Sequence, residues 1–215
     1  MVKTRLNQSL PSPAVTALYR CLLEDTIALA KSLNEVEVAI MCPASDTGEL
    51  EQWLGHTVEI VAQRGAGLAA GLTSVFAQFA ASGQRRVIAF NSDSPHLPAG
   101  FLKSAFHALA VHDLIIGPTH DGGYYLVGAR AAHATLFEND GLGTRSALER
   151  LLARAKVLEL STGLTEPFYD IDVADDLIRL GRELELAPAR APRTAAWFAE
   201  WRQAVGQLRH RIGEL

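Results

Sequence analysis

Short apolar segments that alternate with longer amphipathic ones are the feature of this sequence that most restricts its fold. The short runs have the length and β-branched content of strands, and they cover 36–42, 58–62, 87–90, 113–117, 124–128 and 157–160. The longer segments repeat apolar side chains at helical spacing, and they cover 13–33, 49–54, 68–81, 97–110, 131–137, 144–155 and 173–184. This alternation predicts an α/β fold with a mostly parallel sheet, in which the run 87–90 is buried on both faces. Ligands of such folds bind outside the carboxyl ends of the strands.

Composition excludes several classes of protein. Of 215 residues, 48% are apolar and 20% charged, with a net charge of −4, which argues against disorder and against nucleic-acid binding. The sequence contains no run of 18 apolar residues, so it predicts no membrane-spanning helix. The first residues lack the apolar core of a signal peptide. Cys21 and Cys42 do not make a disulfide framework. We therefore expect a soluble, cytoplasmic protein.

A Pro- and Ala-rich break at 186–192 divides the chain. Residues 1–185 are predicted to form the main domain, and 186–215 a C-terminal extension. The extension contains a basic helix at 193–212 that carries Trp197 and Trp201. Packing onto the main domain is one interpretation of this helix, and a surface for a partner or a homodimer is the other.

Two acidic segments are candidates for a metal site. Asp93 lies in the segment Ser-Asp-Ser-Pro-His-Leu-Pro that follows the apolar run 87–90, where a carboxylate can bind Mg²⁺ or Mn²⁺. Asp170 and Asp172 alternate in an extended segment and so share one face. The alternative for each segment is a helix start, because Asp and Ser cap helices and acidic residues complement the helix dipole. His96, in the first segment, is a weaker candidate for substrate binding.

Two glycine-containing loops are candidates for binding the rest of a substrate. In the segment 117–128, Asp121 can accept hydroxyl groups, and Gly122 and Gly123 allow close backbone approach. The alternative is a β-hairpin turn, for which Asp-Gly is a common signal. Of the two tyrosines that follow, one is expected to point into the cleft and the other into the core. The loop that contains Gln63, Gly65 and Gly67 precedes a helix, whose N–H groups can bind a phosphate or a base edge.

Taken in order, five segments resemble one known family. They read VKTRL, a Gly-rich loop after Gln63, SDSPHLP, DGGYYLVG and YDIDVADDL, and together they span roughly residues 2–185. The chain is similar to the glycosyltransferase-A-like family known as radical-SAM/selenodomain-associated transferase 1. Wider relatives of that family are nucleotide-diphospho-sugar transferases and guanylyltransferases. SDSPHLP and DGGYYLVG are the specific parts of this resemblance.

The resemblance implies a Rossmann-like glycosyltransferase-A fold that binds a nucleoside di- or triphosphate together with Mg²⁺ or Mn²⁺. The site residues follow from the matching motifs. Phosphates would contact Lys3 and Arg5, and the base pocket would involve Gln63, Gly65 and Gly67. The metal would bind Asp93, with Asp170 or Asp172 nearby, and the sugar or acceptor would face His96, Asp121, Gly122, Gly123 and Tyr124. Asp93, Asp121 and Asp172 are the expected catalytic residues.

The chain departs from the family pattern in three places. The family has an apolar strand and a Lys- and Pro-containing loop before VKTRL. We therefore expect either a start upstream of Met1 or a shortened member whose sheet lacks its first strand, with an open groove there or a partner that fills it. Gly67, Ala69 and Gly71 replace the Asp, Gly and Arg of the family's Gly-rich segment, and Leu142 and Gly143 replace a Trp-Ser pair. The expected function is metal-dependent glycosyl or nucleotidyl transfer to a small acceptor. The alternative is a non-catalytic nucleotide-binding or scaffold protein.

Overall fold

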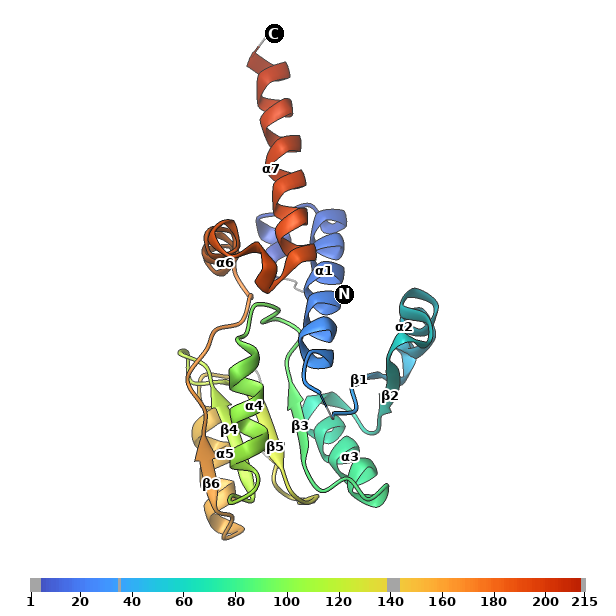
Figure 1. The fold of residues 1–215 in the computed structure, drawn as a ribbon, viewed down its shortest axis with the longest axis vertical. Coiled ribbons are helices and arrows are strands. Elements are labelled where there is room, and N and C mark those ends of the chain that lie inside the picture. The colour runs from blue at the N-terminus through green and yellow to red at the C-terminus, as the bar shows by residue number, and fades with distance from the viewer. Residues whose placement is uncertain (1–4, 35, 139–143, 214–215) are drawn as a thin grey trace. The chain divides into compact units, whose positions relative to one another are not determined.

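The computed structural model describes residues 5–34, 36–138 and 144–213, with side chains up to residue 204. The chain forms two compact units. The first unit comprises residues 1–29, 92–98 and 170–215, and the second comprises 30–91 and 99–169. Figure 1 shows the elements of both units, coloured along the chain from the N-terminus to the C-terminus. No helix in the described ranges is long and apolar enough to cross a membrane.

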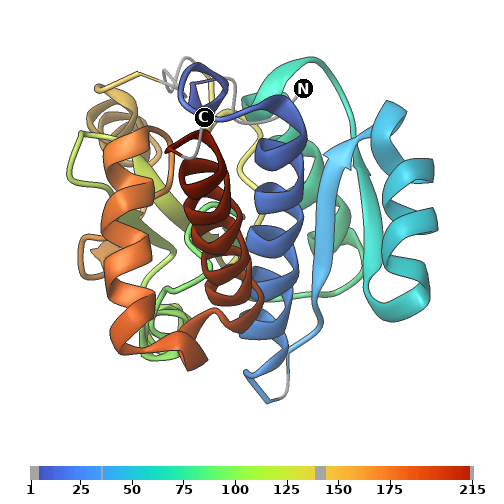
Figure 2. The ribbon, with the colours of Figure 1, turned by 90° about the horizontal axis from the view of Figure 1, so that it is seen from above.

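Helices make up the regular structure of the first unit. They are η1 (Leu6–Gln8), α1 (Ser12–Lys31), α6 (Ala174–Leu186), η4 (Pro188–Arg190) and α7 (Pro192–Gly213). Figure 2 shows α7 between α1 and α6. The buried Asp25 on α1 accepts hydrogen bonds from the Thr194 N–H and hydroxyl, each 2.8 Å long, and from the Arg193 N–H at 3.2 Å. These bonds satisfy N–H groups in the first turn of α7, which would otherwise have no intrahelical acceptor.

The second unit contains all of the strands found in the described residues. Its strands are β1 (Ala39–Pro43), β2 (Glu59–Gln63), β3 (Val87–Phe90), β4 (Leu114–Pro118), β5 (Tyr124–Ala129) and β6 (Thr162–Leu164). Its helices are η2 (Ala44–Asp46), α2 (Thr47–Leu54), η3 (Gly55–Thr57), α3 (Gly67–Ala81), α4 (Ala99–Ala108) and α5 (Ala147–Val157). The α/β class predicted from the sequence is confirmed.

Two sequence predictions about individual elements are wrong. Residues 131–137 form turns instead of a helix, although Leu136 and Phe137 are buried in the core. Residues 157–160 are not a strand, because α5 runs through Val157 and the chain turns before β6 begins at Thr162. Thr-Gly-Leu at 162–164 is held as a strand by parallel pairing with Leu114–Ile116, which is a tertiary constraint that its own sequence does not signal.

Strand pairing produces two separate sheets instead of one. β1 and β2 pair in parallel, and the four-stranded sheet has the order β3-β5-β4-β6. β5 is antiparallel to both β3 and β4, whereas β4 and β6 are parallel. The four-stranded sheet is more mixed than the alternation of strands and helices suggested.

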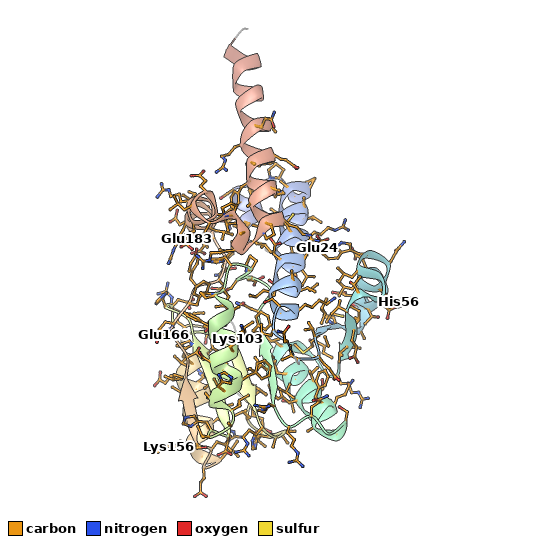
Figure 3. The ribbon with its side chains drawn as sticks, in the orientation of Figure 1. Glu24, His56, Lys103, Lys156, Glu166 and Glu183 are labelled. Carbon is orange, nitrogen blue, oxygen red and sulfur yellow. The ribbon has the colours of Figure 1, made fainter. Side chains whose placement is uncertain are left out.

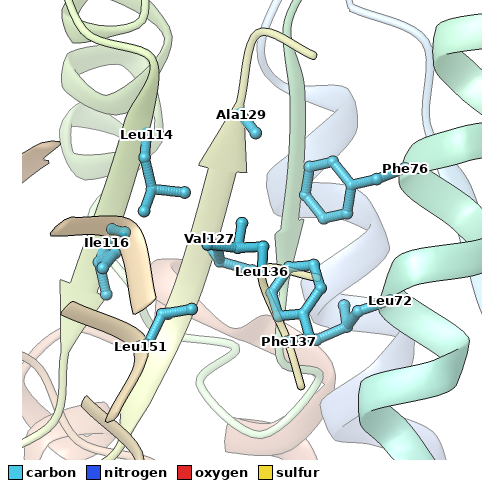
Figure 4. Close-up of a cluster of buried hydrophobic side chains, with 10 residues drawn as sticks. Leu72, Phe76, Leu114, Ile116, Val127, Ala129, Leu136, Phe137 and Leu151 are labelled. Atoms are coloured by element: carbon cyan, nitrogen blue, oxygen red, sulfur yellow. The ribbon is translucent and has the colours of Figure 1, made fainter. Parts of the chain in front are cut away.

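A cluster of apolar side chains fills one face of the four-stranded sheet (Figure 4). Leu72 and Phe76 of α3 and Leu151 of α5 pack there against Ile116 of β4 and Val127 of β5. Complete burial of one such side chain stabilises a fold by about 1.5–3 kcal/mol. β4 is buried at every residue. This core fixes the carboxyl end of β4. The candidate site residues of the segment 117–128 begin there.

The prediction that Val87–Phe90 is buried on both faces is wrong. All four side chains of β3 are only partly buried. The run is as apolar as that of β4, but β3 pairs with β5 alone, whereas β4 has a neighbour on each side. The open edge of β3 accounts for the incomplete burial.

Candidate functional site

The acidic segments of the first unit lie side by side. The Ile171 N–H donates a 3.0 Å hydrogen bond to the Asp93 carbonyl oxygen. Ile171 is fully buried, whereas Asp170 and Asp172 are partly exposed. Because successive side chains of an extended segment alternate, the two aspartates share the face opposite Ile171. The structure thus brings Asp93 next to the segment that carries Asp170 and Asp172.

Arg5 and Asp172 form an ion pair across 167 positions of the sequence. Their side chains are 65% and 42% exposed, so the pair lies at the surface of the unit. The sequence predicted phosphate contact for Arg5 and metal binding for Asp172, but gave no sign that the two touch. Lys3, the other predicted phosphate contact, lies outside the described residues.

The carboxylates on the two acidic segments suit a hard cation that is also bound by oxygen atoms of a substrate. Among the residues that the structure describes, no three His, Cys, Asp or Glu side chains are grouped closely enough to hold a metal. Mg²⁺ is commonly bound by one or two carboxylates together with substrate phosphates. Carboxylates on two adjacent segments fit that pattern, and metal binding by Asp93 with Asp170 or Asp172 stays a prediction.

Asp176 has the structural role that the sequence analysis gave as the alternative for the acidic segment. Its carboxylate accepts the N–H of Asp172 at 3.1 Å and the N–H of Val173 at 2.9 Å. This arrangement caps the start of α6 and holds Asp172 at the end of the extended segment.

His96 is fully buried in the first unit. Its Nε2 lies 3.7 Å from the carboxylate of Glu183, a residue of α6 that is labelled in Figure 3. Arg190 donates a 2.6 Å hydrogen bond to the His96 carbonyl oxygen. Burial lowers the pKa of His96 to about 4, so the ring is neutral at pH 7. Ser94, Pro95 and Leu97 beside it are buried as well, and the substrate contact of His96 stays a prediction.

The second group of candidates is the turn that joins β4 to β5. The Thr119 hydroxyl donates a 2.6 Å hydrogen bond to the Asp121 carboxylate, and the Gly123 N–H donates another at 3.3 Å. The Thr119 hydrogen bond lowers the pKa of Asp121 below its ordinary value. The hairpin that was the structural alternative is therefore present, and it holds an exposed, ionised carboxylate at its tip.

Gly122 fixes this turn against the start of α5. It has a φ of +92°, and a Cβ placed there would overlap the Arg145 carbonyl oxygen. The Leu148 N–H donates a 3.0 Å hydrogen bond to the Gly122 carbonyl oxygen. Only glycine satisfies both the backbone angle and the close approach.

Tyr124 and Tyr125 point to opposite faces, as the strand alternation predicted. Tyr124 is partly exposed, whereas Tyr125 is 1% exposed and its hydroxyl lies 2.8 Å from the Thr165 hydroxyl. Burial raises the pKa of Tyr125. Thr119 was not among the residues predicted from the sequence. The pattern that could have identified it is a hydroxyl side chain two positions before an aspartate in a turn.

The Gly-rich loop joins β2 to α3 in the second unit. Gly65 and Gly67 have φ values of +85° and +82°. The Gln63 side chain packs against Gly71, where a Cβ would lie 2.6 Å from Oε1 of Gln63. The Arg64 N–H donates a 2.9 Å hydrogen bond to the Ser74 hydroxyl, which ties the loop to α3. Gly71, one of the departures from the family pattern, thus makes room for Gln63.

Known structures with the same fold include proteins described as a candidate transferase and as a synthase. A candidate nucleotide-diphospho-sugar transferase from Desulfovibrio desulfuricans G20 matches with a TM-score of 0.86 and 26% identity, over 96% of this chain and 91% of that one. The 4-diphosphocytidyl-2C-methyl-D-erythritol synthase of Anaerococcus prevotii DSM 20548 matches with a TM-score of 0.54 and 13% identity, over 76% and 86% of the chains. The first match confirms the resemblance to nucleotide-diphospho-sugar transferases, and the second shows the shared fold.

Sequence comparison identifies the family. No curated protein sequence matches the chain. The model of a family described as "uncharacterized protein conserved in bacteria" matches residues 26–144, which is more than half of the chain and includes the segments of Asp93 and Asp121. The chain therefore belongs to this bacterial family, DUF2064.

Proposed function

We propose that the chain is a metal-dependent transferase that acts on a nucleotide or a nucleotide-sugar. The observation that carries the proposal is the hydrogen bond between the Ile171 N–H and the Asp93 carbonyl, which sets Asp93 beside Asp170 and Asp172. The fold shared with the Desulfovibrio protein, which is described as a candidate nucleotide-diphospho-sugar transferase, supports the same class of substrate.

Each group of residues has a distinct part in the proposed reaction. Asp93 and Asp170 would hold Mg²⁺ or Mn²⁺, which neutralises the charge that develops on a leaving phosphate. Arg5 would contribute a fixed positive charge to the phosphates, as a guanidinium binds them bidentately. In the second unit, taken by itself, the Asp121 carboxylate is kept ionised by Thr119 and can accept a hydrogen bond from a hydroxyl group.

Two reactions fit these roles. In nucleotidyl transfer, an oxygen of the acceptor forms a bond to the α-phosphorus and pyrophosphate leaves. In glycosyl transfer, the acceptor forms a bond to the anomeric carbon and the nucleoside diphosphate leaves. Both require the same neutralisation of a diphosphate, so the acidic segments serve either reaction.

A second candidate function is nucleotide binding without catalysis. The division of the strands into two sheets and the replacement of the family's charged pair by Gly67 and Gly71 favour it. Retention of Asp93, Asp121 and Asp172 favours the enzyme.

Thermal stability measured with a panel of nucleotides separates these functions. Nucleoside di- and triphosphates and nucleotide-sugars are each added with and without Mg²⁺ or Mn²⁺. A ligand at 100 times its Kd stabilises by about 2.7 kcal/mol, which raises the Tm by several degrees. The transferase proposal expects a shift that needs the metal and is selective for one base, followed by turnover with an acceptor.

Matched variants test the assignment of Asp93. Asp93→Asn should abolish the metal-dependent shift, because the amide is a poor ligand for a hard cation. Asp175→Asn removes the same charge from the first turn of α6 and should leave the shift unchanged. An Asp93→Asn protein that keeps the full shift would show that the metal and nucleotide bind elsewhere. Binding without turnover would favour the non-catalytic function.

A further inference from the structure

Asp93 lies in a loop whose backbone is held on both sides. The Asp93 carbonyl oxygen accepts the Ile171 N–H at 3.0 Å, and in the turn that follows the Leu97 N–H donates a 3.0 Å hydrogen bond to the Ser94 carbonyl oxygen. Ser94 and Ile171 are fully buried. The Cα–Cβ bond of Asp93 therefore has a fixed direction, and rotation about that bond, χ1, determines where the carboxylate points.

Two hydroxyl groups of α1 contact the residue before Asp93. The buried Thr26 hydroxyl donates hydrogen bonds to the Leu22 carbonyl oxygen at 2.8 Å and to the Ser92 carbonyl oxygen at 3.3 Å. The half-buried Tyr19 hydroxyl lies 3.3 Å from the Ser92 hydroxyl. Tyr19 and Thr26 lie about two helical turns apart on one face of α1. Within the first unit, α1 therefore holds Ser92 at both its carbonyl and its hydroxyl.

The hydrogen bonds through Ser92 run in one direction. The Ser92 hydroxyl donates to Oδ1 of Asp93 at 3.4 Å. A serine hydroxyl has a single proton, so the proton between Ser92 and Tyr19 comes from the tyrosine. The chain runs from Tyr19 through Ser92 to the Asp93 carboxylate, and each donor polarises the next. Both oxygen–oxygen distances exceed the roughly 2.8 Å of a typical O–H···O bond, so each bond alone holds the carboxylate weakly.

Contacts of this kind are typical of carboxylates that bind metals. The ligating groups of metal sites are commonly oriented by outer hydrogen-bonding partners, and replacement of such a partner weakens metal binding by about 10–100-fold. A carboxylate has about four lone-pair sites, and the bond from Ser92 takes one of them. Ser92 can therefore orient Asp93 while the same carboxylate binds a cation.

We propose that Tyr19 and Ser92 are positioning residues for the metal-binding carboxylate of Asp93. The Tyr19 hydroxyl orients the Ser92 hydroxyl, which in turn holds Asp93 in the χ1 rotamer that binds Mg²⁺ or Mn²⁺. Tyr19 and Ser92 are 73 positions apart in the sequence, so α1 takes part in the site through a contact that no local motif encodes. This inference rests on the proposed function, because that function assigns the metal to Asp93.

NMR of the metal-free protein tests the orientation of Asp93 directly. Vicinal couplings of the Asp93 carboxyl carbon to its backbone nitrogen and carbonyl carbon report the χ1 rotamer. The parent protein should show one rotamer. Ser92→Ala and Tyr19→Phe should both show averaged couplings, because each removes one hydroxyl of the chain. Ser92→Thr retains the hydroxyl and should keep the couplings of the parent protein.

Titration of the same proteins with Mn²⁺ measures the consequence for metal binding. Paramagnetic broadening of the Asp93 and Ser94 amide signals locates the ion and gives its Kd. Ser92→Ala should raise this Kd by about tenfold or more, as expected for loss of an outer partner of a ligand. Tyr19→Phe should raise it by about three- to tenfold, because the Ser92 hydroxyl remains. Ser92→Thr should bind Mn²⁺ as the parent protein does.

Thr16→Val is the matched control, because it removes a hydroxyl of α1 that bonds to the Ser12 carbonyl oxygen within the helix. It should leave the Asp93 couplings and the Mn²⁺ Kd unchanged. Mn²⁺ binding that is lost in Asp93→Asn but unchanged in Ser92→Ala and Tyr19→Phe would overturn the positioning role alone. Parent-like Asp93 couplings in those two variants would also overturn it. A parent protein that bound no Mn²⁺ at Asp93 would contradict the proposed function, and with it the metal assigned here.

Discussion

The Thr119 hydroxyl and the Asp121 carboxylate are joined by a 2.6 Å hydrogen bond within the turn between β4 and β5. The donor is buried and the acceptor is exposed, so the bond holds a charged group at the surface in one orientation. A carboxylate that is held in one orientation and stays ionised can position a substrate hydroxyl.

Replacement of Thr119 by valine should raise the pKa of Asp121 toward its ordinary value, because the hydroxyl hydrogen bond is the largest cause of the depression. A carboxylate with a lowered folded pKa adds stability above its unfolded pKa, and that stability is lost as the pH falls through the folded pKa. The stability that is lost below about pH 4 should therefore be smaller in the Thr119→Val variant than in the parent protein. NMR titration of the side-chain carbon measures the shift. Thr73→Val, which removes a hydroxyl bonded to a helix carbonyl, should leave the Asp121 titration unchanged.

Gly122 is expected to be intolerant of any side chain. Gly122→Ala should destabilise the protein by about 2–4 kcal/mol, because the Cβ adds backbone strain at φ +92° and overlaps the Arg145 carbonyl. Urea denaturation measures the loss. Gly48→Ala is the matched control, since nothing lies within 4 Å of its Cβ position in α2, and it should be neutral or stabilising. Equal effects of the two substitutions would contradict this geometry of the turn.

The Arg5–Asp172 ion pair should be weak. Both side chains are substantially exposed, and pairs of this kind contribute about 0.2–1 kcal/mol. A double-mutant cycle with Arg5→Met and Asp172→Asn should give a coupling energy in that range, which falls toward zero as salt is added. The weakness matters for function, because Arg5 can exchange its carboxylate partner for a phosphate at little cost. A coupling energy above about 2 kcal/mol that resists salt would make the pair a structural tie instead.

The fold was predictable wherever an element carries its own pattern. β3 begins after Arg86 and ends before Asn91, so four apolar residues between polar ones define its bounds. β6 carries no such pattern, and its pairing with β4 determines it. The alternation of Asp170 and Asp172 predicts a shared face, and this stays a prediction. Arg5 meets Asp172 across 167 positions, and no local pattern encodes a contact of that range.

Because of His96, the stability of the protein should depend on pH. The pH range lies between the pKa of this histidine in the unfolded state and its pKa in the folded state. The folded pKa is about 4, because burial opposes the charged ring, whereas an unfolded histidine titrates near 6.5. Across this window the unfolded state binds a proton that the folded state does not, so the stability present above pH 6.5 is lost as the pH falls toward 4. Glu183 favours the charged ring, whereas Arg190 and Arg179 oppose it.

The loss between pH 7 and pH 5 should be about 2 kcal/mol, and urea denaturation at the two values measures it. His96→Leu should remove most of this dependence, even if it lowers stability at pH 7, because leucine does not titrate. His107→Gln, at an exposed position on α4, should leave the dependence as it is in the parent protein. If the His96→Leu and parent proteins lost equal stability between pH 7 and pH 5, the buried ring would not be what couples folding to protons.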